Sequence, residues 1–263
     1  RSPCVEAVCA TLRAAQGLAE RLADELATSD AWPEPPPPVV APGPEPDRGS
    51  PLQGVLLLLW CLAALVVPLA LWRRRGASWA APAWVWLLAL AAIGLRLALA
   101  WRIGVRPDEL LDWGRPDLWG DVAGVEARMN PPLYRVLTAP LAWIVDGDPR
   151  LSRLGPILMG GAATWVAAKI GLSLGGVRAG LVAGIVTAVH PLLALAGVFH
   201  RPYALLVLWT LLTIGAVGAA LTSGRRDHRL LAASLAGGLP LVHYFGVGVL
   251  AGVAAWVLFD RRR

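Results

Sequence analysis

The chain has 263 residues, of which 56% are hydrophobic and only 16% charged, and its mean hydropathy is +0.57. A soluble domain of this length carries nearer a quarter of charged residues, so the composition excludes an ordinary soluble domain. The apolar residues fall into blocks of roughly the 20 residues that cross about 30 Å of hydrocarbon, which indicates a multi-pass membrane protein.

The net charge is +6, and all of the 24 basic residues except Lys169 are arginines. A basic balance is also typical of nucleic-acid-binding proteins. Here, however, the arginines lie in short clusters at the ends of apolar blocks, which positive-inside topology explains better, so we expect no nucleic-acid partner. The cysteines predict no disulfide framework, because Cys61 lies in an apolar span and Cys4 and Cys9, five residues apart on a helix, point to different faces.

Residues 1–31 predict an N-terminal amphipathic helix with an apolar stripe opposite its charges. The stripe consists of Val8, Leu12, Leu18, Leu22 and Leu26. Such a helix is typical of packing or partner contacts and not of a catalytic site. The proline-rich segment 32–51 favours extended polyproline geometry and predicts a stiff linker, so the transmembrane region comprises residues 52–263.

Six apolar blocks in this region predict membrane-spanning helices. They are residues 52–72, 80–103, 151–173, 179–199, 202–222 and 230–260. The last block is long enough for two short crossings broken near Gly237, Gly238 and Pro240.

With that pair of crossings, four basic clusters share the cytoplasmic side. They are RRR at 73–75, Lys169 with Arg178, RRDHR at 225–229 and RRR at 261–263. The loop 104–149 then lies on the outer face. So does 1–51, unless the first apolar block does not span and the N-terminus faces inward.

The predicted fold is therefore all-α, a polytopic transmembrane helical bundle with juxtamembrane helices in the first large outer loop. Trp113, Trp119 and Trp143 suit a membrane surface, where parts of this loop lie as short amphipathic helices. Most acids of the loop are ordinary solvated charges. Asp108 and Glu109 differ, because they follow directly after a span and are held near the membrane, where a carboxylate can accept a hydroxyl proton or coordinate a divalent cation.

Five landmarks follow in order along the chain. They are the acidic pair in RPDE (Asp108, Glu109), the PPLY stretch from Asn130 to Tyr134, the span opening RLSRLGPILMG, the RPYAL segment after Pro191 with Arg201 and Tyr203, and HYF at His243 to Phe245. In this order they resemble the GT-C class of membrane glycosyltransferases, especially the bacterial relatives of protein O-mannosyltransferases and of the aminoarabinose transferases acting on lipid A. The resemblance covers about residues 80–260 and corresponds to the N-terminal half of such proteins.

The resemblance implies a multi-pass enzyme of the bacterial inner (cytoplasmic) membrane and cell envelope. Such an enzyme passes a sugar from a polyprenyl-phosphate-linked donor to a glycan, lipid or protein acceptor on the outer face. It also implies that the PPLY prolines start a helix under the outer leaflet, since proline in the first turn loses no hydrogen bond it needed.

Residue roles follow from this resemblance. Asp108 would deprotonate the acceptor hydroxyl, and Arg201 would bind the donor phosphate, because a guanidinium binds phosphate bidentately and stays protonated. Glu109 either orients the acceptor or holds a divalent cation, and the sequence leaves the metal requirement open. The remaining substrate-binding candidates are Asn130, Tyr134, Tyr203, His243 and Tyr244, the last two as hydrogen-bond donors.

Two departures from the family leave an alternative open. Relatives carry E-A-R where this chain has Phe199, His200 and Arg201, and they continue with several more spans after the FDRRR at which this chain stops. The alternative is a non-catalytic GT-C-derived membrane scaffold or a truncated fragment. A transporter is disfavoured, because its polar groups would cluster at mid-membrane in two related halves.

Two ionisable residues lie inside predicted spans, where charge is costly. Arg96 lies near the outer end of its span, so we expect its side chain to snorkel toward the interface. His190, directly before Pro191, makes either a helix-end hydrogen bond or a ligand contact.

Overall fold

The computed structural model describes residues 51–74, 81–104, 132–138 and 149–260. These residues form helices joined by turns, and no strand occurs among them, which confirms the all-α prediction. The predicted N-terminal helix (1–31) and all but the last residue of the linker lie outside these ranges.

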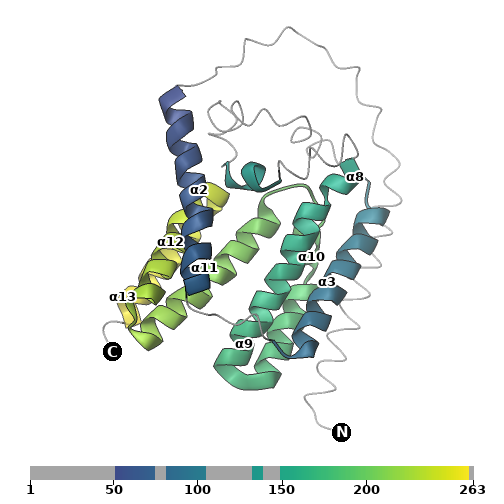
Figure 1. Ribbon diagram of the computed structural model, residues 1–263. Coiled ribbons are helices and arrows are strands. Elements are labelled where there is room, and N and C mark those ends of the chain that lie inside the picture. The colour runs from purple at the N-terminus through teal and green to yellow at the C-terminus, as the bar shows by residue number, and fades with distance from the viewer. Residues whose placement is uncertain (1–50, 75–80, 105–131, 139–148, 261–263) are drawn as a thin grey trace. The chain divides into compact units, whose positions relative to one another are not determined.

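The helices follow one another as Figure 1 labels them. They are α2 (Pro51–Arg74), α3 (Ala83–Arg102), α8 (Pro149–Ser152), α9 (Leu154–Val189), α10 (Pro191–Ala196), α11 (Tyr203–Ser223), α12 (Arg226–Val242) and α13 (Phe245–Asp260). A further short helix covers residues 133–138, inside the predicted PPLY helix. Among the described residues, three helices, α3, α9 and α11, are long and apolar enough to cross a membrane, whereas the apolar stretches Cys61–Leu71 and Phe245–Phe259 are shorter.

α9 is a hairpin of two arms. Gly175 and Gly176 leave the helical conformation, and Gly176 has a φ of 70°, which glycine adopts without strain because it has no Cβ. The chain reverses at this point, so that Gly184 lies against Ala168 of the first arm (Figure 1). The predicted spans 151–173 and 179–199 are therefore neighbours in one hairpin.

The second arm of α9 is interrupted where an unbroken span was predicted. Helix α9 ends at Val189, His190 has an extended ψ of 123°, and Pro191 begins α10. Proline has no N–H and disfavours helical geometry in the residue before it, which explains the break. Residues 177–196 together supply the roughly 20 residues that a membrane crossing needs, so a crossing by this arm requires α10 as well.

Small residues let α3 and α9 approach each other closely. A side chain at Gly161 would meet Ile93, and a side chain at Gly180 or Gly184 would meet Trp84 or Leu88. Apolar helices in lipid gain little from the hydrophobic effect, so close backbone contact through small residues is their usual means of association.

The α12–α13 hairpin is broken at a different place from the one predicted. Gly237, Gly238 and Pro240 all lie inside α12, and the break comes at His243 and Tyr244. Gly238 serves helix packing instead, because its surface is covered by the indole of Trp209, whose N–H donates to the carbonyl of Leu235 at 2.7 Å.

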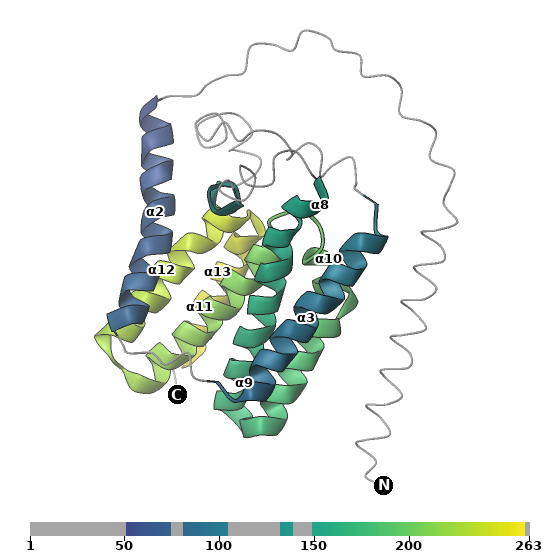
Figure 2. The same ribbon diagram turned by 45° about the vertical axis from the view of Figure 1, so that its right-hand side comes forward.

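The helix ends fall into two groups at opposite ends of the bundle. The basic end consists of the end of α2, the turn of α9 before Arg178, the α11–α12 turn with Arg225 and Arg226, and the end of α13 (Figures 1 and 2). The aromatic end consists of helix 133–138, the start of α11 and the α12–α13 turn. The basic clusters thus adjoin one end, as a common cytoplasmic location requires.

Candidate functional site

Four landmark segments that are far apart in the sequence meet at the aromatic end. The Tyr134 hydroxyl lies 3.2 Å from Nδ1 of His200, and the same nitrogen lies 3.2 Å from the carbonyl oxygen of Ser152. The rings of Tyr203 and His243 have centroids 5.4 Å apart. The PPLY, RLSRLG, RPYAL and HYF segments therefore form one cluster, with Tyr134, Tyr203 and His243 as the predicted site residues that it brings together.

Tyr134 and His200 are both buried, and their pairing suits either form of the imidazole ring. A carbonyl only accepts, so a hydrogen bond to Ser152 requires the proton on Nδ1, and the Tyr134 oxygen then accepts from the same N–H. With the proton on Nε2, the Tyr134 hydroxyl donates to Nδ1 instead. Tyr134 is thus a buried partner of His200.

His200 was not among the predicted site residues. The sequence signal for it is the departure from E-A-R at Phe199 and His200, because a histidine at this place adds a side chain that can form hydrogen bonds. In the structure His200 joins helix 133–138 to Ser152 at the end of α8, so it anchors the segment that ends in Arg201.

Arg201 precedes the first turn of α11 and is half-buried. Its backbone N–H donates to the carbonyl of Phe199 at 2.7 Å, which closes a tight turn. Val198, five residues before the start of α11, is fully buried against Ala100 and Ile157. The turn that carries Arg201 is therefore packed into the bundle on its inner side.

His243 lies at the centre of an aromatic group. Its ring is 3% exposed and its centroid lies 4.0 Å from that of Tyr244 and 4.8 Å from that of Phe245. Nδ1 accepts a hydrogen bond from the backbone N–H of Phe245 at 3.1 Å, so the neutral ring carries its proton on Nε2. Burial lowers the pKa of His243, which favours this neutral form.

The aromatic group offers two kinds of hydrogen-bond donor. Tyr203 and Tyr244 are exposed, so their side chains are accessible from outside the bundle. His243 is left with its Nε2–H as the one ring donor, because Nδ1 already accepts from the start of α13. The expected donor roles of His243 and Tyr244 are compatible with this arrangement.

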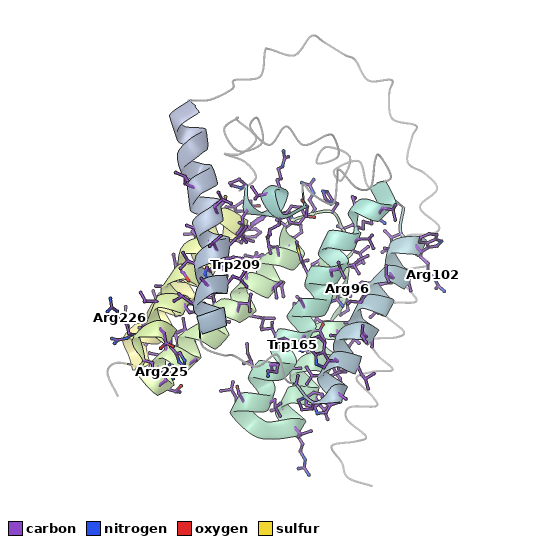
Figure 3. All side chains as sticks on the ribbon, in the orientation of Figure 1. Arg96, Arg102, Trp165, Trp209, Arg225 and Arg226 are labelled. Atoms are coloured by element: carbon purple, nitrogen blue, oxygen red, sulfur yellow. The ribbon has the colours of Figure 1, made fainter. Side chains whose placement is uncertain are left out.

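Arg96 is buried, and the prediction that it snorkels was wrong. The residue is 1% exposed and lies between α3 and α9, as Figure 3 shows. Its guanidinium donates to the carbonyls of Ala92 (3.0 Å), Thr187 (3.2 Å), Leu193 (3.3 Å) and Ala188 (3.4 Å). These carbonyls, three of which lie at the break in the second arm of α9, replace the water that snorkelling would reach.

Arg153, also buried, holds the end of α3. It donates to the carbonyls of Ala100 (2.9 Å), Ile103 (2.8 Å) and Gly104 (2.8 Å). The last carbonyls of a helix have no partner within it, and a cation there interacts favourably with the helix dipole. Arg153 therefore fixes the chain just before the segment that leads to Asp108.

The acidic pair Asp108 and Glu109, and Asn130, lie outside the described residues. Within the described part of the chain, no three His, Cys, Asp or Glu residues gather in a way that could hold a metal ion. His190 lies at the helix break, where its backbone N–H donates to the carbonyl of Val186 at 2.9 Å. The residue is exposed.

Comparisons with protein-family models, with curated proteins and with solved structures find no match to this chain.

Proposed function

We propose that the protein is a GT-C-type glycosyltransferase of the bacterial inner membrane. It transfers a sugar from a polyprenyl-phosphate donor to an acceptor on the outer face. The observation that carries the proposal is the meeting of four landmark segments at the aromatic end, through the Tyr134–His200 and Tyr203–His243 contacts. Contacts across such sequence distances are what a site assembled from several helices requires.

The chemistry needs one base and one cation. As the acceptor oxygen forms its bond to the anomeric carbon, Asp108 takes the hydroxyl proton, and the bond from that carbon to the phosphate oxygen breaks. The leaving polyprenyl phosphate gains negative charge, which Arg201 stabilises through its guanidinium. The exposed hydroxyls of Tyr203 and Tyr244 lie on the same end and supply further donors.

The proposed membrane topology follows from the basic end and the aromatic end of the bundle. Basic clusters at one end favour a cytoplasmic location for it, so the aromatic end faces outward. Arg201 then lies at the start of α11, near the outer boundary of a helix that is long and apolar enough to cross the membrane. That is the depth at which the phosphate of a polyprenyl lipid lies.

Binding of polyprenyl phosphate to the protein in lipid nanodiscs tests the proposal. Loss of a charge-assisted bidentate contact in Arg201→Ala should weaken binding by roughly 10- to 100-fold, and Arg201→Lys should weaken it less, because it keeps the charge but loses the fork. Arg178→Ala removes the same charge from an exposed position at the basic end and is the matched control.

Equal affinities of Arg201→Ala and Arg178→Ala would contradict the role of Arg201. If the parent protein does not bind polyprenyl phosphate, the proposed glycosyltransferase activity is contradicted, and the interpretation as a non-catalytic scaffold is left.

A further inference from the structure

The break between α9 and α10 creates carbonyls that the helix itself cannot pair. In an unbroken helix the Thr187 carbonyl would accept from the N–H of residue 191, but Pro191 has none. The chain also leaves helical geometry at His190, which removes the regular partner of Ala188. An unpaired carbonyl in an apolar interior is strongly unfavourable, so these groups need a donor from elsewhere.

Arg96 supplies that donor from α3. Its Nη2 binds the Thr187 carbonyl before the break and the Leu193 carbonyl after it, and its Nη1 binds the Ala188 carbonyl. Arg96 therefore ties the two helices on either side of the break to each other and to α3. The planar guanidinium holds its donors in fixed directions, so it sets the angle at which α10 leaves α9.

Two glycines make room for this side chain. A Cβ at Gly160, in the first arm of α9, would overlap with Nε and Cδ of Arg96, and so would a Cβ at Gly197, directly after α10. The space occupied by the Arg96 side chain is thus bounded by three segments, α3, α9 and the residue that follows α10.

The same segment leads directly to Arg201. From Gly197 the chain passes through buried Val198 to His200, which contacts Tyr134 and Ser152. The short turn is consequently anchored twice, by Arg96 before it and by His200 within it. A six-residue helix such as α10 is too short to keep its geometry unaided, so its position depends on such external contacts.

We propose that Arg96 is a positioning residue that fixes α10 across the His190–Pro191 break and thereby holds Arg201 where the donor phosphate binds. The second half of this statement rests on the proposed function, whereas the fixing of α10 does not. Arg96 touches no substrate and acts through the backbone of the segment that it holds.

The first measurement is the distance between spin labels on cysteines placed at Leu174 and Leu192, which are 82% and 71% exposed. These positions are separated by about 20 Å of helix, and the three native cysteines are replaced by serine. The variants are Arg96→Met, which removes the donors, Arg96→Lys, which keeps a charge but not the fork, and Gly160→Ala, which displaces the side chain without altering the break. Gly94→Ala, in α3 with open space around it, is the matched control.

The parent and Gly94→Ala should give the same narrow distance distribution. Arg96→Met and Gly160→Ala should broaden or shift it by several ångströms. Arg96→Lys should give a distribution intermediate between those of the parent and Arg96→Met. Gly160→Ala keeps the test decisive if Arg96→Met fails to fold. A distribution in Gly160→Ala that superposes on that of the parent would overturn the inference.

The second measurement is the affinity for polyprenyl phosphate in nanodiscs. Arg96→Met and Gly160→Ala should bind roughly 10-fold more weakly than Gly94→Ala, because a displaced Arg201 loses its bidentate geometry. Altered distances with unaltered affinity would refute the link to Arg201. A parent that binds no lipid would refute the proposed function, and the distance measurement would still decide the role of Arg96.

Discussion

The two ends of the bundle use their arginines in opposite ways. At the basic end Arg225 and Arg226 are exposed, as Figure 3 shows, and Arg225 donates two bonds of 3.1 Å to the carboxylate of Asp227. Toward the aromatic end Arg96 and Arg153 are buried, and the partners described above for each are backbone carbonyls, which apart from that of Ala92 lie at helix ends.

This difference separates charges that orient the chain from charges that shape it. An exposed arginine with a nearby acid contributes little to stability, so its value lies in topology. A buried arginine that pairs helix-end carbonyls determines where those helices stop and how the next segment leaves them. Substitutions should therefore have large effects at the aromatic end and small ones at the basic end.

The most direct test of this difference asks whether the basic end and the aromatic end lie on opposite sides of a membrane. In a variant whose three native cysteines are serine, Asp108→Cys should react in intact cells with a membrane-impermeant thiol reagent, and Arg225→Cys should not. The expected contrast is all or none, because the reagent does not cross the bilayer. Reaction at position 225 but not at 108 would reverse the orientation.

The next largest effect is expected on turnover. Asp108→Asn keeps the size and hydrogen bonding of the side chain but removes its basicity, so sugar transfer should fall by on the order of 10² to 10⁴, the usual contribution of a positioned base. Asp117→Asn, in the same loop but outside the RPDE landmark, should leave the rate almost intact. Equal losses of rate in the two variants would mean that the total charge of the loop matters and not one base. Near-normal turnover of Asp108→Asn would contradict the proposed mechanism.

A matched pair of substitutions compares the two ends by stability. Arg153→Met keeps the volume but leaves three helix-end carbonyls of α3 unpaired, so the free energy of unfolding should fall by about 3 kcal/mol. Arg226→Met, at the exposed basic end, should change it by less than about 0.5 kcal/mol. Chemical unfolding in detergent, followed by the helical circular dichroism signal, measures both, and similar losses would abolish the distinction between the ends.

The smallest effect concerns the pH dependence of stability at the α12–α13 turn. The folded-state pKa of His243 is lowered from its ordinary value of 6.5, so between the two pKa values the unfolded chain binds more protons than the folded one. Stability is then fully present above pH 6.5 and falls as the pH drops toward the lowered pKa. Protonation also removes the acceptor for the Phe245 N–H, a helix-start contact of a kind worth about 1 kcal/mol.

His243→Asn keeps an acceptor at the helix start without a titrating ring, so it should flatten this acidic slope. His190→Asn, at an exposed residue, is the control and should leave the slope unchanged. A slope that persists in His243→Asn would assign it to another group.

Hydropathy along the chain predicted much of the fold. The apolar blocks at 80–103 and 202–222 correspond closely to α3 and α11, and the Gly175–Gly176 turn lies between two predicted spans. The PPLY prolines predicted a helix start, and residues 133–138 are helical. These features depend on local composition, backbone freedom and proline geometry, which are properties of each segment by itself.

The polar residues were harder to place, for a physical reason. Hydropathy treats Arg96 as a charge that must reach water, whereas in the structure it binds the carbonyls of Thr187 and Ala188, 91 and 92 residues further along the chain. Likewise, the break in the last block moved from Gly238 to His243, because Trp209 of another helix occupies the surface of that glycine. The amino-acid sequence alone determined which segments are apolar and helical and where the chain can turn. Tertiary packing decided which helix ends find a donor, because a buried hydrogen bond depends on a partner that only the folded chain brings near.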